Sequence, residues 1–448
     1  MSLALCADVG STYTKVVVVD LAGGAVVAAA DHPTTAGSDV LHGLDAAVAA
    51  TRVTVPPERW YVCSSAGGGL RLAVVGYEEL VTAQAGHRVG LSAGARVVHV
   101  SAGPLGSLAP LRAARPDVVL LVGGTDGGDA AVLAHNARRL ARARWRVPVV
   151  LAGNADARDD LAALLREAGV PVTATDNVLP RIGVLEPGPA RAAIRDVFLS
   201  HVIGGKGLSR GRRFPSLVRA ATPDAVLTGV EVLADHTGGD LLVVDVGGAT
   251  TDVYSVLTPD GRTDDVAGTL WRSRTVEGDL GMRWSAPDVI RAAVAERLVG
   301  KGPPPTAGVD GGVDAGLAAL RAAAELRAAT PGFVPSDDAE RAVDRTIAAL
   351  AAIVAVRRHA RGPAGRTGRD LRDARMLVGS GGVLRHATPG EAKEVLDAVL
   401  TDFAGGWPVP RAATPVVDVS YVLAAAGLLA ADHPDASRAL LDRHLRAA

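Results

Sequence analysis

The chain has 448 residues, enough for two or more domains with cores of their own. Hydrophobic residues make up 48% and charged residues 21%, and a formal net charge of −1 gives no electrostatic argument for binding nucleic acid or an anionic membrane. The N-terminus shows no signal-peptide pattern, and the longest apolar run, residues 347–356, is too short to cross a bilayer. We therefore expect a soluble, cytoplasmic protein.

Two residue types are scarce. The two cysteines, Cys6 and Cys63, lie in apolar runs, which favours reduced, buried thiols and excludes a zinc or iron–sulfur site built on cysteine alone. The 47 basic residues include only four lysines, so the lysine at position 15 stands out.

The first 92 residues predict a compact α/β unit. Runs at residues 3–8, 14–20 and 24–30 indicate a three-stranded meander, followed by a helix at 38–51 and a strand at 60–63. A glycine-rich loop ("SSAGGGL") then leads into another strand, and a helix at 79–92 closes the unit.

From residue 93 the pattern changes to alternating strands and helices. Expected strands are 97–100, 117–124, 147–153 and 170–176, with helices near 129–145 and 156–168. This spacing is typical of βαβ units in a parallel sheet. Residues 189–235 are predicted to be mostly helical.

The opening pattern returns at 241–256, with a third strand within 263–276. The remaining segments are a Pro/Gly-rich loop at 300–315, helices at 316–328 and 337–359, a strand, turn and helix at 374–386, a helix at 390–403, and a strand that runs into an apolar helix at 416–431. We therefore predict two similar halves with a graft between them: a first lobe at 1–92, an inserted α/β domain with a helical segment at 93–235, and a second lobe at 236–448.

The repeat is visible in two short segments. "DVGSTYTKVVVV" (8–19) and "DVGGATTDVYSV" (245–256) share Asp8/Asp245, Gly10/Gly247 and Thr14/Thr251 among other positions. Each spells a strand ending in Asp, a glycine-rich turn and a second strand. Such hairpins are common, and chance is the alternative explanation.

Both segments suit phosphate chemistry. Backbone N–H groups of a tight glycine turn form an anion-binding concavity, and the hydroxyls of Ser11, Thr12 and Thr250 add donors. Carboxylates at the strand ends, Asp8 and Asp245, must hold something positive, most naturally hydrated Mg²⁺. Lys15 could reach a β- or γ-phosphate as a point charge.

Two other glycine-rich turns are candidates. "VGSGGVLRH" (378–386) lies between a strand and a helix and would allow close backbone approach to adenine. "VGGTDGGD" (122–129) could bind an anion or could be an ordinary strand-to-helix turn. The sequence contains neither a GxxxxGK[ST] P-loop nor a GxGxxG fingerprint.

The order of these motifs resembles the actin, Hsp70 and sugar-kinase ATPase superfamily. The resemblance implies two RNase H-like lobes with an inserted α/β domain. In it, "DVGSTYTK" is the first phosphate loop, "DVGGATTD" the second, and "GSGGVLR" the adenosine loop with Gly379, Gly381 and Gly382. "YVLAAAGLL" resembles the helix that connects the lobes, and a lysine at the offset of Lys15 occurs in actin.

Four segments narrow the match. "ADVGSTYTKVVVVD", "CSSAGGGLRLAVVG", "LLVGGTDGGD" and "EGDLGMRW" resemble the glutamate mutase accessory family of the MutL or GlmL type. This implies a chaperone-like ATPase, a reactivase, that serves an adenosylcobalamin-dependent mutase. No Asp-x-His-x-x-Gly motif for cobalamin itself is present, and a dehydratase activator would need cluster-binding cysteines.

The expected site therefore binds ATP and Mg²⁺. Asp8, Asp245 and Lys15 are the candidate catalytic residues, with the two aspartates holding the metal; the candidate nucleotide-binding residues are Gly10, Ser11, Thr12, Gly247, Gly248, Thr250, Glu277, Gly379, Gly381 and Gly382. Glu277, with Asp279, either lies near the ribose or catalytic water or is an acidic helix cap. Two other functions stay open: a small-molecule kinase on the same fold, and a nucleotide switch that does not hydrolyse ATP.

Overall fold

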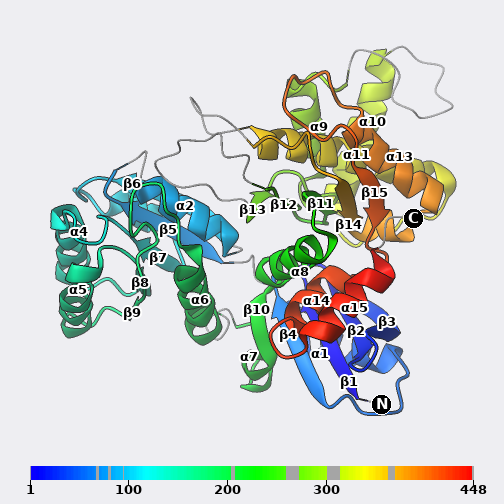
Figure 1. The fold of residues 1–448 in the computed structure, drawn as a ribbon. Helices are drawn as coiled ribbons and strands as arrows, with labels where there is room; N and C mark the ends of the chain where they lie inside the picture. Colours follow the sequence, from blue (N-terminus) through cyan, green and yellow to red (C-terminus); the bar gives the residue numbers. More distant parts are fainter. Residues whose placement is uncertain are drawn as a thin grey trace.

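The structure is a computed structural model, and it describes residues 2–66, 70–78, 82–93, 95–202, 207–258, 272–299, 313–361 and 369–445. These residues form three five-stranded sheets, two in a pair of stacked lobes and one in an inserted domain that lies to the left in Figure 1. None of the described helices combines the length and apolar character needed to cross a lipid bilayer.

The first lobe is built on a mixed sheet. Its strands are β1 (Leu3–Val9), β2 (Tyr13–Asp20), β3 (Ala25–Pro33), β4 (Arg59–Ser64) and β10 (Val218–Ala221), in the order β10-β4-β1-β2-β3. β1, β2 and β3 form the predicted antiparallel meander, and β4 pairs parallel with both β1 and β10. Both faces of β2 are buried, because helix α1 (Val40–Ala50) covers one face and helices between the lobes cover the other.

The second lobe repeats this topology. Its strands are β11 (Leu241–Val246), β12 (Thr251–Val256), β13 (Arg272–Glu277), β14 (Met376–Ser380) and β15 (Thr414–Val417), in the order β13-β12-β11-β14-β15. Its helices are α9 (Ala286–Ala295), α10 (Val313–Ala329), α11 (Asp338–Ala360), α12 (Gly382–His386) and α13 (Pro389–Leu400). Numbered within each lobe, both sheets have the strand order 3-2-1-4-5, which confirms the predicted duplication.

Three helices lie between the two lobe sheets, as Figure 1 shows: α8 (Thr222–Thr237), α14 (Val422–Leu429) and α15 (Pro434–His444). Their apolar side chains form one core with residues of both sheets, including Cys6 and Cys63, which are buried and unpaired as predicted. α8 and α14 cross where two glycines meet. A Cβ at Gly229 would lie 2.0 Å from the Leu423 carbonyl oxygen, and a Cβ at Gly427 would lie 1.8 Å from that of Ala225.

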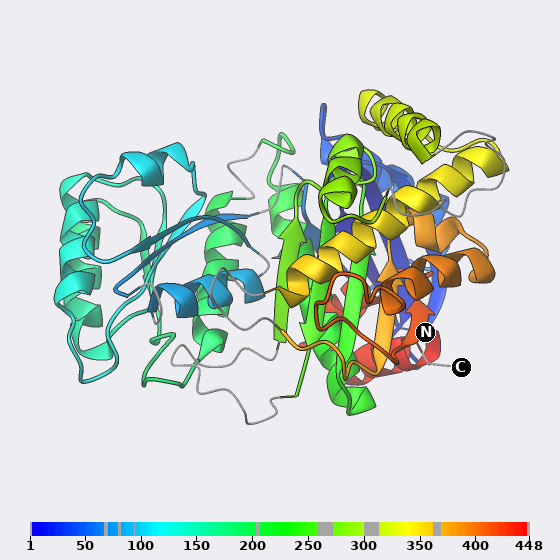
Figure 2. The same cartoon turned by 90° about the horizontal axis from the view of Figure 1, so that it is seen from above.

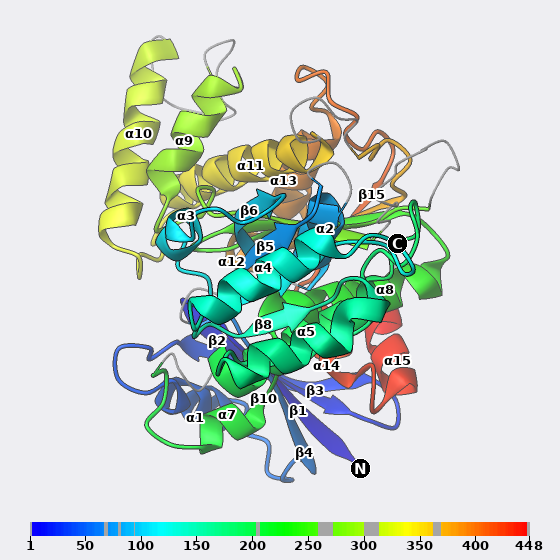
Figure 3. The same ribbon diagram turned by 90° about the vertical axis from the view of Figure 1, so that its left-hand side faces the viewer.

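The inserted domain is a parallel α/β layer structure with helices on both sides of its sheet (Figures 2 and 3). Its strands are β5 (Arg71–Gly76), β6 (Arg96–Ala102), β7 (Val118–Leu121), β8 (Val149–Leu151) and β9 (Val172–Ala174), in the order β6-β5-β7-β8-β9. The helices from this part of the chain are α2 (Thr82–Ser92), α3 (Ala109–Ala113), α4 (Ala131–Arg142), α5 (Ala155–Glu167), α6 (Pro187–Val197), the π-helix η1 (Phe198–Val202) and α7 (Arg213–Leu217).

The structure places the domain boundaries differently from the predicted 1–92, 93–235 and 236–448. β5, expected in the first lobe, lies inside the inserted sheet between β6 and β7. At the other boundary, β10 returns to the first lobe and pairs with β4. The insertion therefore lies between the fourth and fifth strands of the first lobe. A buried strand has the same apolar pattern whichever sheet it joins, so the sequence pattern could not assign β5.

Candidate functional site

Each lobe contributes one tight hairpin turn to the space between the lobes. The N–H of Gly10 donates to the Tyr13 carbonyl over 3.1 Å, and the N–H of Gly247 donates to the Thr250 carbonyl over 2.9 Å. A Cβ at Gly10 would lie 2.7 Å from the Tyr13 oxygen, and a Cβ at Gly247 would lie 2.9 Å from the Thr250 oxygen. Both distances are too short for a real side chain, so each turn requires glycine at this position.

The two turns face each other across a cavity of about 750 Å³. A Cβ at Gly248 would lie 3.1 Å from the Thr12 hydroxyl oxygen, so the turns are almost in contact. The predicted site residues that line this cavity are Asp8, Gly10, Ser11, Thr12, Lys15, Asp245, Gly247, Gly248, Thr250, Gly381 and Gly382. The volume suits a small molecule, since such sites typically enclose about 300–1,000 Å³.

Asp8, the residue before the last of β1, lines the cavity. Its carboxylate accepts a hydrogen bond of 2.5 Å from the hydroxyl of Thr222, the first residue of α8. Burial raises the pKa of Asp8, and the nearby Lys15 and the Thr222 hydrogen bond partly oppose that shift. Asp245, the matching carboxylate of the second lobe, also raises the Asp8 pKa, which indicates that the two negative groups interact.

Lys15 lies directly across the β1–β2 hairpin from Asp8. Its Nζ is 3.8 Å from an Asp8 oxygen and 3.9 Å from the centroid of the Tyr421 ring, and its side chain is 21% exposed. Burial alone would lower the pKa of Lys15, but Tyr421, Asp8 and Asp245 more than offset this and raise it. The ammonium group is therefore held charged at the cavity wall.

The second lobe has an acid where the first has this lysine. Asp252 lies across the β11–β12 hairpin from Asp245, in the register that pairs Lys15 with Asp8. An Asp252 oxygen accepts a hydrogen bond of 2.9 Å from Arg274, and both residues line the cavity. Burial raises the pKa of Asp252, and Arg274 opposes the shift. We did not predict Asp252 or Arg274 as site residues, although the seven-residue offset that selected Lys15 also selects Asp252.

The third glycine turn closes the cavity from the second lobe. Gly381 has a φ of +109°, and a Cβ there would lie 2.2 Å from the Val246 carbonyl oxygen, so the turn packs directly on the end of β11. Gly382 has open space beside it. Farther along α12, Arg385 forms an ion pair of 2.9 Å with Asp31 of β3, which connects the two lobes.

Two predicted site residues lie elsewhere. The Glu277 carboxylate accepts a hydrogen bond of 2.8 Å from Arg358 of α11, which also binds Asp279 over 2.7 Å, and neither acid lines the cavity. Gly379 is buried within β14, where a Cβ would lie 2.8 Å from the side chains of Leu384 and Leu396. Glycine at this position therefore allows α12 and α13 to pack closely on the sheet.

The loop at 122–129 follows β7 and also lies outside the cavity. Amide groups of two asparagines bind its carbonyls: Asn154 donates to Thr125 over 2.6 Å, and Asn177 donates to Gly124 over 2.9 Å. Because these contacts occupy its carbonyl groups and hold it in place, we interpret this loop as an ordinary strand-to-helix turn.

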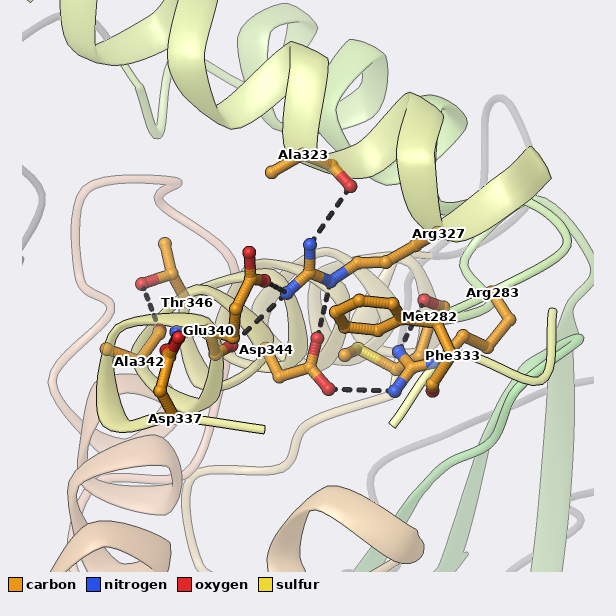
Figure 4. Close-up of polar contacts among 10 residues, drawn as sticks. All are labelled: Met282, Arg283, Ala323, Arg327, Phe333, Asp337, Glu340, Ala342, Asp344 and Thr346. Carbon is orange, nitrogen blue, oxygen red and sulfur yellow. Dashed lines mark hydrogen bonds and ion pairs between the residues drawn. The ribbon is translucent and has the colours of Figure 1, made fainter. Parts of the chain in front are cut away.

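A buried polar network forms the wall next to the second turn (Figure 4). The N–H of Arg283 donates to the Gly248 carbonyl over 2.8 Å, and its guanidinium donates to Asp344 over 2.8 Å and to the Phe333 carbonyl over 3.1 Å. Asp344 also accepts from the fully buried Arg327 of α10 over 2.5 Å. The second turn is thus connected through Arg283 to helices α10 and α11.

The hydroxyl groups and glycine turns that line the cavity suit a phosphate-bearing ligand, and its carboxylates would suit a metal ion bound to that phosphate. Among the described residues, no group of three or more His, Cys, Asp or Glu side chains is arranged to hold a metal ion. Asp8 and Asp245 are nevertheless two carboxylates in one cavity, and Mg²⁺ commonly uses one or two carboxylates together with phosphate oxygens.

Two sheets of identical strand order, crossed helices between them and a cavity between two Asp-Gly turns define a two-lobed protein with the fold of the actin and sugar-kinase type. Residues 4–445 match the sequence model of the family described as "MutL protein". Protein MutL of Clostridium tetanomorphum is 35% identical over 477 aligned residues, which cover 99% of each chain. The chain therefore belongs to the MutL family of glutamate mutase accessory proteins, as its motifs predicted.

Solved structures of low sequence identity are also similar. Nucleotide-free acetone carboxylase matches with 13% identity over 96% of this chain and 70% of its own, at a TM-score of 0.41. Nucleotide-free diol dehydratase-reactivating factor matches with 12% identity over 97% of this chain and 100% of its own, at a TM-score of 0.37.

Proposed function

We propose that this protein binds Mg-ATP between its lobes, hydrolyses it, and uses the resulting lobe movement to act on an adenosylcobalamin-dependent mutase. The observation that carries the proposal is the pair of Asp-Gly turns that face each other almost in contact, at the Gly248–Thr12 approach of 3.1 Å. A ligand held by both turns would connect the lobes.

The turns supply the groups that a triphosphate needs. Backbone N–H groups of each glycine turn, with the hydroxyls of Ser11, Thr12 and Thr250, would bind phosphate oxygens. Lys15 would place a positive charge against the terminal phosphate. Asp8 and Asp245 would hold Mg²⁺ and its waters, and the ion, when bound, would neutralise phosphate charge.

The adenosine end is assigned to the third glycine turn. Gly382 leaves open space at the cavity wall, and a flat base could approach the backbone there because no side chain intervenes. Arg385 and Tyr421 also line the cavity, and the guanidinium carbon of Arg385 lies 4.7 Å from the centroid of the Tyr421 ring.

The partner is proposed from the family. Membership of the glutamate mutase accessory family supports a cobalamin enzyme as the target. The two lobes contact each other through the crossed helices α8 and α14, and closure of the lobes around a ligand would move them relative to each other.

The first experiment follows the γ-phosphate of labelled ATP. Purified protein is incubated with Mg²⁺, alone and with a metabolite extract, and the products are separated. Free phosphate in both tubes is the expected result. Label on a small molecule of the extract would instead identify a kinase, and ATP that stays intact with and without a purified mutase would contradict hydrolysis.

A further inference from the structure

The inserted domain reaches the cavity through an arginine. Arg96 is the first residue of β6, the edge strand of the inserted sheet, and it lines the same cavity as the two turns. Its N–H donates to the Leu70 carbonyl over 2.8 Å, which fixes the start of β6 beside the chain that enters the insertion.

Arg96 lies beside Gly278, at the end of β13. Its two terminal guanidinium nitrogens are 3.7 and 3.8 Å from the position that a Cβ would take at Gly278. The carbonyl oxygens of Gly278 and Ala249 both lie within hydrogen-bond distance of the Ser285 hydroxyl, at 3.3 and 3.2 Å. Ala249 belongs to the second turn, so Ser285 connects the segment beside Arg96 to that turn, and Arg96 and the turn line the same cavity.

Arg96 differs from the other cations that line the cavity. The other cations that line the cavity form ion pairs, namely Lys15 with Asp8, Arg274 with Asp252, Arg283 with Asp344, Arg341 with Asp338, Arg345 with Glu391 and Arg385 with Asp31. Within the described part of the chain, Arg96 is the cavity-lining cation for which no carboxylate lies at ion-pair distance.

We propose that Arg96 binds the terminal phosphate of the nucleotide, so that the inserted domain distinguishes a triphosphate from a diphosphate. A guanidinium binds phosphate oxygens through paired N–H donors, and a cation at the terminal phosphate stabilises the charge carried there. A diphosphate lacks the group that Arg96 would hold, so loss of the terminal phosphate would release β6 from the cavity. This inference rests on the proposed nucleotide site and adds the contact through which the insertion responds to it.

The test compares two nucleotides on four proteins. Dissociation constants for AMPPNP and ADP, each with Mg²⁺, are measured by calorimetry for the wild type, Arg96→Ala, Arg96→Lys and Arg146→Ala. Arg146 is a matched control because it is an exposed arginine of the same domain outside the cavity. We expect Arg96→Ala to weaken AMPPNP binding about tenfold or more and ADP binding less than about twofold, with partial recovery in Arg96→Lys and no change in Arg146→Ala.

Hydrogen exchange supplies a second readout. In the wild type, amides of β6 should exchange more slowly with AMPPNP than with ADP, and this difference should vanish in Arg96→Ala. If Arg96→Ala weakens the binding of AMPPNP and ADP equally, or binds both with wild-type affinity, the proposed role of Arg96 is wrong while the nucleotide site stays in place. A wild type that binds neither nucleotide would instead remove the proposed function itself.

Discussion

In each hairpin, the residue directly across the ladder from the aspartate near the end of the first strand lies seven positions later in the chain. In the first lobe this cross-strand pair is Asp8 and Lys15, and in the second it is Asp245 and Asp252. The repeated backbone therefore carries opposite charges at the corresponding position. The duplicated turns have become chemically different: the first can stabilise phosphate charge, and the second can hold a cation or orient water.

Replacement of Asp245 tests this division directly. Asp245→Ala removes the carboxylate of the second turn, and we expect ATP turnover to fall about 100-fold or more because a preorganised charge at the reacting group is lost. Steady-state phosphate release measures the effect, and circular dichroism checks that the fold is intact. Asp397→Ala, which removes a half-exposed carboxylate of α13 that does not line the cavity, should keep wild-type turnover. Undiminished turnover in Asp245→Ala would refute the assignment.

A second carboxylate should make stability depend on pH. Asp418 is 1% exposed and accepts hydrogen bonds from the N–H groups of Val422 and Leu423 at the start of α14. Burial raises its pKa from an ordinary 3.8 to about 6, with those hydrogen bonds opposing the shift. Between pH 4 and 6 the folded state binds this proton more tightly than the unfolded state, so the free energy of unfolding falls as pH rises through that range.

Asp418→Asn keeps a hydrogen-bond acceptor but cannot ionise. From pH 4 to pH 7 the wild type should lose on the order of 2–3 kcal/mol of unfolding free energy relative to this variant. Urea unfolding of both proteins across that range measures the difference. Parallel pH profiles would show that Asp418 does not titrate in this way.

Most of the site could be predicted from short-range pattern. Asp8 and Lys15 lie in one hairpin and Asp245 lies in the other, each with its own glycine turn, so sequence spacing fixes how they lie within each hairpin. Glu277 could not be placed in this way, because its position depends on Arg358, a residue of α11 that lies 81 residues away in the chain. Arg96 could not be predicted as a site residue for the same reason, since only the folded insertion brings it to the cavity.

At the scale of the elements, helices α8 and α14 cross with a glycine from each helix at the contact. Because a Cβ at Gly229 or Gly427 would fall about 2 Å from a carbonyl oxygen of the other helix, any larger residue must separate the helices. Separation would disturb the core shared by the two lobes, since both helices contribute to it.

We expect Gly229→Ala and Gly427→Ala each to lower the free energy of unfolding by about 1–3 kcal/mol through overpacking. Gly316→Ala is the control, because Gly316 lies in α10 with no atom within 4 Å of a Cβ position, and alanine there should be neutral or stabilising. Chemical denaturation compares the three variants. Equal tolerance at all three positions would show that the crossing can relax at no cost.

Element order was more predictable than element partnership. The duplicated meanders were recognisable because each strand follows its neighbour in sequence and pairs with it. β5 and β10 pair with strands far along the chain or across the insertion, and the sequence pattern contains no record of such pairing. The fold class was therefore correct while the domain boundaries were displaced.

For the whole molecule, the shared interlobe core implies that the lobes unfold together. A ligand bound by both turns should then raise the melting temperature of a single transition, and an analogue at a hundred times its Kd stabilises by about 2.7 kcal/mol. Scanning fluorimetry with Mg-AMPPNP, against Mg²⁺ alone, measures this shift. Two separate lobe transitions, of which only one moves, would contradict binding across the cavity.

The two ends of the insertion lie close together on one sheet. β4 ends at Ser64, and the returning strand β10 begins at Val218 opposite Val62, only two residues from that end. A segment whose ends meet can be lengthened, shortened or exchanged while the flanking strands stay in register. In evolutionary terms, the insertion is a replaceable module. Proteins that share the duplicated lobes could acquire new targets by changing this module alone.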